Sequence, residues 1–197
     1  MIAHLKKGSL LFVFCMMVYD LAYTQTAYKL KGPNTMKLFG TSSLHKWSMT
    51  STSCAGDAQF NFTAGATNVL TSIGALSFML PVLSLKSGKS GLDNNAYKAL
   101  KTDRYKNIIY TLTSAKVASV VANRYLLKTK GDLNIAGVTK DMAMDVYCTV
   151  NKDKTITCTG ASNIRMTDHN VQPPTFMSGA MKTGDAIKLE FNMVFAN

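Results

Sequence analysis

Apolar side chains occupy every second position along several separate runs of this chain. They fall mostly on odd positions in 124–135 and 187–195, and on even positions in 142–150. Successive side chains on a β-strand point to opposite faces, so each run predicts a strand with one apolar and one polar face. Repeated over many strands, the pattern describes a sandwich or a barrel with an apolar interior, and the pattern alone does not choose between the two.

Turn residues and short spacings divide the rest of the chain into further strands. One segment, 71–85, contains Pro81, which cannot donate to a sheet ladder and should mark an edge or a bulge. The one convincing helix covers 94–102, with Asp93 as its N-cap, and 171–184 reads as a long irregular segment. We therefore predict an all-β, antiparallel domain of about eight strands with one short helix. The expected strands are 27–30, 35–41, 47–55, 57–62, 71–85, 106–117, 124–135, 138–150, 155–161 and 185–195.

The start of the chain has the composition of a secretory signal peptide. Lys6 and Lys7 precede an apolar run at 9–18, and small residues follow near Ala22. This run is shorter than the stretch of about 20 apolar residues that a membrane helix needs. We therefore predict a signal peptide over 1–24 and a mature domain over 25–197 that is periplasmic or secreted.

Export would place the cysteines of the mature chain, Cys54, Cys148 and Cys158, in an oxidising compartment. Cys148 and Cys158 flank the polar turn 151–154, and a five-residue hairpin loop would put them opposite each other on the apolar face. A disulfide and two buried thiols fit equally well, because a shift of one residue in register would separate the two side chains. With no histidine close to these cysteines, we expect neither a metal site nor a cofactor.

The formal net charge of the chain is +11 at pH 7. Such a charge favours anionic surfaces, including phospholipid headgroups, so transient contact with a membrane surface is consistent with it. The lysines are scattered, however, and no basic run with interleaved aromatic residues is present. This distribution argues against a nucleic-acid partner. The sequence carries no signal for an oligomeric state.

Several motifs, in this order and at this spacing, resemble the YceI-like family of exported polyisoprenoid-binding proteins. The resemblance extends over nearly the whole mature chain and is strongest in KGDLNIAGVTK at 130–140. It also departs from the family pattern at Lys46, where an acidic residue is expected, and at Ala96, where methionine is usual. The other motifs are GTSSLHKW at 40–47, LKSG at 85–88, LD at 92–93, YKALK at 97–101, RMTD at 165–168, PTFMSG at 174–179 and KTGD at 182–185.

The resemblance implies a lipocalin-like antiparallel barrel with a long hydrophobic interior. It also implies a long-chain amphiphile as ligand, such as a polyisoprenoid, a fatty acid or a fatty amide. Within KGDLNIAGVTK, Gly131 and Gly137 have a structural interpretation: they allow backbone conformations that other residues avoid, and Ala136-Gly137 makes a tight turn between strands. The departures at Lys46 and Ala96 affect loops that could shape the mouth of the cavity.

The inward-facing side chains are the candidates for ligand contact. From the alternation alone they could equally fill a solid core; the many methionines favour an adaptable apolar surface, and the resemblance favours a ligand tunnel. His45 and Trp47 are candidates for the mouth or the headgroup site, although a turn histidine bonded to backbone is the simpler interpretation of His45. The interior candidates are Leu127, Met142, Met144, Val146, Leu189, Phe191 and Met193.

These observations favour a non-catalytic protein that binds, sequesters or transports a long-chain lipid. One alternative is a lipid-modifying hydrolase, but no nucleophile–base pair is recognisable, and Ser42 and Ser43 lack the G-x-S-x-G frame. The other alternative is a filled structural barrel that acts through a protein partner. A packed interior would favour that second alternative, and an apolar cavity would favour a carrier.

Overall fold

The computed structural model describes residues 23–63, 69–176, 179 and 181–197. The signal-peptide prediction falls on 1–22, outside the described residues, apart from its last two positions, which begin the first strand. The strands are β1 (Tyr23–Leu30), β2 (Thr35–Thr41), β3 (Lys46–Ser51), β4 (Ala55–Thr63), β5 (Leu70–Pro81), β6 (Asn107–Val121), β7 (Arg124–Ile135), β8 (Val138–Val150), β9 (Ile156–Arg165), β10 (Thr175–Phe176), β11 (Met181–Lys182) and β12 (Ala186–Ala196); the helices are η1 (Val82–Ser84), α1 (Ser90–Ala99) and η2 (Thr167–His169).

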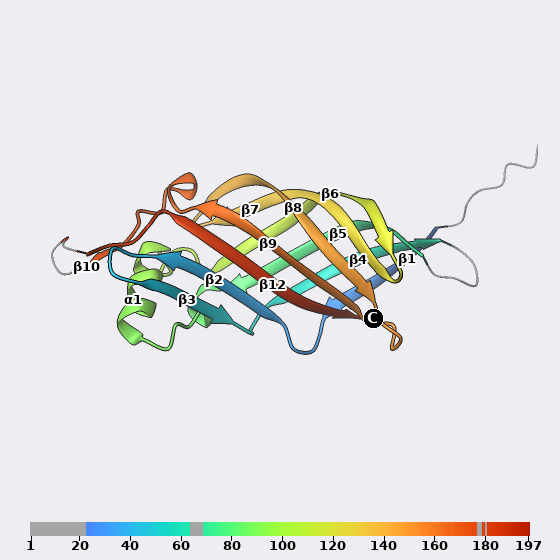
Figure 1. Cartoon of the computed structure of the whole chain (residues 1–197), viewed down its shortest axis with the longest axis horizontal. Helices are drawn as coiled ribbons and strands as arrows, with labels where there is room; N and C mark the ends of the chain where they lie inside the picture. Colours follow the sequence, from blue (N-terminus) through green and yellow to red (C-terminus); the bar gives the residue numbers. More distant parts are fainter. Residues whose placement is uncertain (1–22, 64–68, 177–178, 180) are drawn as a thin grey trace, which may run out of the picture.

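Eight antiparallel strands close into a barrel, in the order β1-β4-β5-β6-β7-β8-β9-β12 (Figure 1). The ring closes where Lys29 and Leu30 of β1 pair with Ala196 and Phe195 of β12. Closure removes the free edges that an open sheet would leave. The barrel predicted from the resemblance is confirmed, and the sandwich that the alternation also allowed is not formed.

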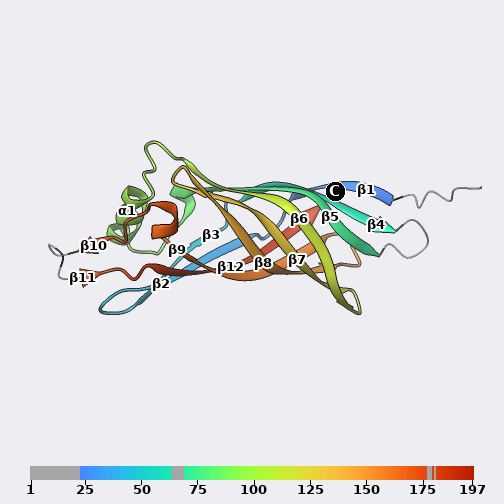
Figure 2. The same cartoon turned by 90° about the horizontal axis from the view of Figure 1, so that it is seen from above.

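Two further strands extend the wall toward one end of the barrel. β2 pairs with β12 on the same edge that β1 uses, over Lys188–Asn192, and β3 pairs with β2. β3 in turn meets the segment after β5, because Thr50 and Lys86 exchange two backbone hydrogen bonds of 2.8 and 2.9 Å. Figure 2 shows α1, β10 and β11 at the same end as this extension, and β1 begins at the opposite end. We call these the α1 end and the closed end.

The hairpin between β7 and β8 has the predicted two-residue corner. Ile135 pairs with Val138, and both residues between them have positive φ, 49° at Ala136 and 81° at Gly137. Positive φ at both central positions is the geometry of a type I′ turn, which matches the twist of the strands. The same interpretation is wrong for Gly131, whose φ is not positive. Gly131 instead leaves room for the Tyr110 ring, because a Cβ atom at this position would collide with it.

Most predicted elements have other boundaries, and two of these differences change an interpretation. The segment predicted to be irregular over 171–184 contains the short strands β10 and β11. The strand expected over 71–85 ends at Pro81 and is followed by η1. The helix begins at Ser90, four residues before its predicted start, so Asp93 lies inside its first turn instead of capping it. The Asp93 carboxylate instead accepts hydrogen bonds from the backbone N–H and the hydroxyl of Ser87, at 2.8 and 2.6 Å, and so fixes the preceding loop. No helix among the described residues is long and apolar enough to cross a bilayer.

Candidate functional site

A cluster of buried side chains occupies the interior of the barrel toward the closed end. The rings of Tyr28 and Phe195 both meet the ring of Phe60 edge to face, with centroids 5.2 and 5.5 Å apart. Leu127 and Ile156 are fully buried in the same cluster. Phe195 also lines the cavity described next, so this cluster closes one end of that cavity.

Toward the α1 end the interior opens into a cavity of about 530 Å³. Its lining is almost entirely apolar, and it comes from six of the eight barrel strands, all but β1 and β4, together with β2, β3, α1 and the β10–β11 hairpin. It reaches the surface at the exposed residues His45 and Lys89. A cavity of this size falls within the range of known small-molecule sites, about 300–1,000 Å³. The barrel is therefore not a filled core throughout its length.

Six of the seven predicted interior residues line this cavity, and Leu127 does not. Leu127 points inward as predicted, but it lies at the closed end, where facing side chains pack against it. The alternation of β7 predicts which side chains face inward but not how far away the opposite wall is. The six lining residues are Met142, Met144, Val146, Leu189, Phe191 and Met193.

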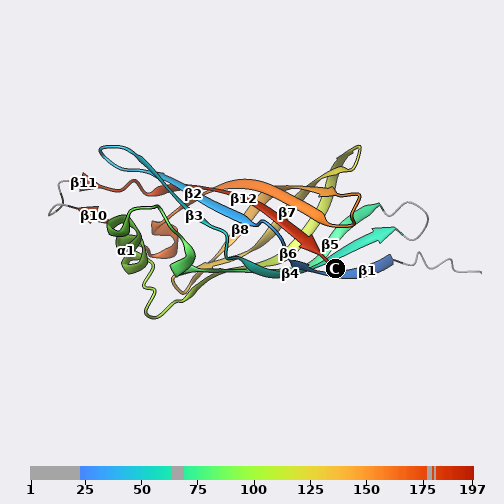
Figure 3. The same cartoon turned by 90° about the horizontal axis from the view of Figure 1, so that it is seen from below.

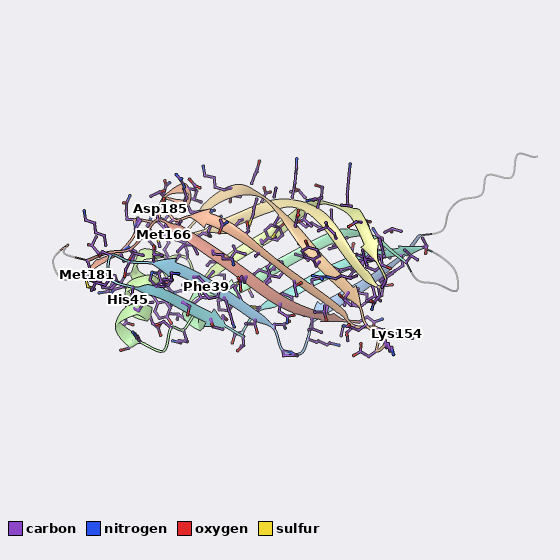
Figure 4. All side chains as sticks on the ribbon, in the orientation of Figure 1. Phe39, His45, Lys154, Met166, Met181 and Asp185 are labelled. Carbon is purple, nitrogen blue, oxygen red and sulfur yellow. The ribbon has the colours of Figure 1, made fainter. Side chains whose placement is uncertain are left out.

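His45 and Trp47, the candidates for the mouth, both contribute to the lining of the cavity. The Trp47 indole Nε1 donates to the carbonyl oxygen of Thr41 at 3.1 Å, which fixes the ring across β2. The His45 side chain is exposed, and its imidazole makes no hydrogen bond with any described residue. The backbone amide of Ser43 donates to the Lys182 carbonyl at 3.0 Å, so the β2–β3 turn is joined to the β10–β11 hairpin. Figure 4 shows His45 and Met181 at this end, with Lys154 at the other.

The helix α1 forms part of the cavity wall, which sequence reasoning did not predict. Leu92, Ala96 and Leu100 contribute to the lining. The Tyr97 hydroxyl faces away from the cavity, donates to the Leu85 carbonyl oxygen at 2.7 Å and accepts from Lys86 Nζ at 2.8 Å. This bond with Tyr97 raises the pKa of Lys86. The view in Figure 3 shows α1 set against the end of the barrel.

The charged groups in the lining are cationic. These are Lys89 and Arg165, and no carboxylate contributes to the lining. The imidazoles of His45 and His169 also lie in the lining. His169 is buried and its Nδ1 lies 3.0 Å from the Val138 carbonyl oxygen, which holds the ring in place. No group of three or more metal-ligating side chains occurs within the described part of the chain.

Asp185 anchors the short helix η2 that carries His169. Its carboxylate accepts from the Thr167 backbone N–H at 2.9 Å and from the Thr167 hydroxyl at 2.8 Å. These two bonds lower the pKa of Asp185, the backbone bond most of all. Negative charge at the start of a helical turn satisfies backbone N–H groups that have no partner within the turn.

Cys148 and Cys158 lie directly opposite each other in the β8–β9 ladder, joined by the predicted five-residue loop. Both are buried free thiols in the structure. Burial, and then the neighbouring Cys148, raise the pKa of Cys158 well above its ordinary value. Cys158 also lines the cavity. The register brings the two cysteines together, which the sequence reasoning had left open, and their thiols are free.

The two serines near His45 are bonded to backbone. Ser42 Oγ donates to the His45 carbonyl oxygen at 3.0 Å, and Ser43 Oγ accepts from the Lys182 amide at 3.2 Å. Neither hydroxyl bonds an imidazole, which a serine nucleophile with a histidine base would need. The arrangement gives no support to the hydrolase alternative.

Comparison with known proteins agrees with this architecture. Two solved structures each give a TM-score of 0.64. BcnA of Burkholderia cenocepacia has 15% sequence identity, and the match covers 83% of this chain and 96% of that one. A polyisoprenoid-binding domain of Saccharophagus degradans, implicated in plant cell wall breakdown, has 12% identity, and the match covers 89% of this chain and 98% of that one. A YceI protein of Campylobacter jejuni matches with 18% identity over 100% of this chain and 92% of that one, at a TM-score of 0.51. At these identities the likeness concerns the fold. No protein with a curated description matched.

The relationship at the level of sequence comes from a family model. The model of the YceI-like domain matches residues 32–195, which include every strand of the barrel except β1. The matched region also holds the whole lining of the cavity. The chain belongs to the YceI-like family.

Proposed function

We propose that this protein binds a long-chain amphiphile in its barrel and sequesters or transports it without catalysis. The observation that carries the proposal is the cavity of about 530 Å³ with an almost wholly apolar lining. Membership in the YceI-like family and the fold shared with a polyisoprenoid-binding domain support the same class of ligand. The ligand class is a polyisoprenoid or a fatty-acid-like lipid.

The size of the cavity sets the scale of the apolar chain. A water-sized group takes about 30 Å³, so a cavity of about 530 Å³ has room for roughly 18 groups of the size of a methylene. Each methylene removed from water contributes about 0.8 kcal/mol. The apolar chain alone therefore supplies more than enough free energy for stable binding, and longer ligands would extend out of the mouth.

The polar end of the ligand is proposed to lie at the mouth, near His45 and Trp47. The cationic side chains Lys89 and Arg165 in the lining suit a polar or anionic headgroup. The same charges would favour brief contact with an anionic membrane surface during transfer. Export to the periplasm or beyond, as the predicted signal peptide indicates, is part of the proposal.

The test is mass spectrometry on organic extracts of the purified full chain, followed by uptake of fluorescent fatty-acid and isoprenoid probes. We expect a copurifying lipid and saturable uptake. Met144→Trp should reduce uptake, because Met144 lines the cavity and a larger side chain would fill it. The matched control is Met79→Trp: Met79 is 37% exposed and lies outside the lining. Extracts without lipid, together with no probe uptake, would end the proposal.

A further inference from the structure

One exposed leucine lies beside the mouth of the cavity. Leu44 is 70% exposed, whereas Ser42 and His45 of the same β2–β3 turn line the cavity. Hydrogen bonds fix the turn: the Ser42 backbone N–H donates to the His45 carbonyl oxygen at 2.9 Å, and Ser42 Oγ accepts from the His45 backbone N–H at 3.2 Å. The turn therefore holds the Leu44 side chain outward. A single exposed leucine is common on protein surfaces, so its surroundings decide what it means.

Further apolar side chains surround the mouth. Pro174, Phe176 and Met181 are only partly buried, and all three line the cavity from the β10–β11 hairpin or from the residue before it. The bond between the Ser43 amide and the Lys182 carbonyl oxygen joins this hairpin to the β2–β3 turn. Figures 2 and 3 show the hairpin between the turn and α1, at the α1 end. The mouth therefore has an apolar rim, and Leu44 is its most exposed neighbour on the turn.

Basic side chains lie next to this rim. The segment 86–106, which includes α1, carries six basic and two acidic residues. One of the acidic residues, Asp93, is buried and accepts two hydrogen bonds from Ser87. Neither of the two ion pairs formed among the described residues involves this segment. Positive charges without anionic partners, beside an apolar rim, complement the surface of an anionic bilayer.

We propose that the α1 end docks on an anionic phospholipid bilayer with the mouth facing it, that Leu44 inserts among the headgroups, and that lipid passes between bilayer and barrel during this contact. The inference rests on the proposed lipid-binding function. A bilayer fits this face better than a protein partner, because the charges surround an opening through which the lipid must pass. A protein bound there would block that opening.

The test follows transfer of a fluorescent fatty acid from the loaded full chain to vesicles of equal parts phosphatidylcholine and phosphatidylglycerol. The rate should rise in proportion to vesicle concentration, and it should fall at high salt and with phosphatidylcholine alone. Leu44→Asp should slow transfer about tenfold or more, because it removes the inserted side chain and adds a repelled charge. The matched control is Val121→Asp: Val121 is 75% exposed at the tip of the β6–β7 hairpin, at the closed end (Figure 2). This control should transfer lipid at the wild-type rate.

The charges are tested in the same way. Lys98→Gln and Lys106→Gln, both in the basic segment, should each slow transfer about fivefold. Lys152→Gln and Lys154→Gln in the β8–β9 loop are the controls, and Figure 4 shows Lys154 at the closed end. None of the substituted residues lines the cavity, so every variant should bind the probe in solution as the wild type does.

The outcomes separate docking from binding. A transfer rate independent of vesicle concentration, or equal losses from Leu44→Asp and Val121→Asp, would overturn the docking proposal and leave lipid binding intact. A loss confined to Val121→Asp would overturn it as well, because the closed end would then meet the bilayer. Failure of the wild type to bind the probe would count against the lipid-binding function itself. Cosedimentation of the unloaded chain with the same vesicles would still test docking, with Leu44→Asp expected to bind them more weakly than Val121→Asp.

Discussion

The contrast between the closed end and the cavity can be tested by two substitutions on one strand. Leu127 and Leu133 both lie on β7 and face inward, at 0% and 7% exposure. Leu127 is buried in the cluster at the closed end and does not line the cavity, whereas Leu133 does. A leucine in a solid core loses its contacts when shortened, while a leucine beside a void already lacks partner atoms on one side.

The expected losses of unfolding free energy differ accordingly. Leu127→Ala creates a new void and should cost about 3 to 5 kcal/mol. Leu133→Ala only enlarges an existing space, so the transfer term for the removed carbons dominates, about 1 to 2 kcal/mol. The difference of about 2 kcal/mol corresponds to about 1 M in the urea midpoint at an m value of about 2 kcal/mol/M.

The assay is urea unfolding of the delipidated full chain, followed by circular dichroism. Leu44→Ala serves as the control, since Leu44 is 70% exposed and its loss should stay within about 0.5 kcal/mol. Equal losses for Leu127→Ala and Leu133→Ala would mean that the interior is packed alike along its length. The reasoning behind the cavity, and with it the lipid-binding proposal, would then fail.

Three further expectations concern other parts of the molecule. Gly137→Ala should destabilise the protein by about 1 to 3 kcal/mol, because Gly137 has φ of +81° and an added Cβ would meet the Tyr105 ring. Gly91→Ala in α1 has open space around it and should stabilise the protein by about 0.5 to 1 kcal/mol. Thermal or urea unfolding measures both changes. Asp185 has a lowered pKa in the folded protein, so its charge stabilises the fold above its ordinary value of 3.8 and this contribution is lost as pH falls through the lowered pKa; the gap in Tm between wild type and Asp185→Asn should therefore close on acidification, and a gap that persists at pH 2 would contradict the assignment. Buried Cys148 and Cys158 should resist iodoacetamide in the native state and react on unfolding; a mass lower by two hydrogens that reductant restores would show instead that they are bonded to each other.

Much of the fold follows from local pattern. The strands expected over 35–41, 124–135 and 138–150 have these bounds in the structure, because alternation and the Ala136-Gly137 turn define both their faces and their ends. The errors occur where tertiary contacts decide. Pro81 ends β5 because the chain there turns into η1, and Asp93 bonds Ser87 instead of capping the helix.

The site could be predicted only in part, for a related reason. Alternation gives the direction of a side chain but not the distance to the opposite wall, so Leu127 and Met142 look alike in the sequence although one is packed and the other lines a cavity. The contribution of α1 depends on how Tyr97 docks the helix against Leu85, which no local pattern encodes.

The pairing of β1 with β12 also has a consequence for how the chain acquires its shape. The ring closes through Lys29 with Ala196 and Leu30 with Phe195, positions that are far apart along the polypeptide. Contacts between such distant segments form slowly, because the long intervening chain must first be ordered. The barrel therefore cannot close until β12 has emerged from the ribosome.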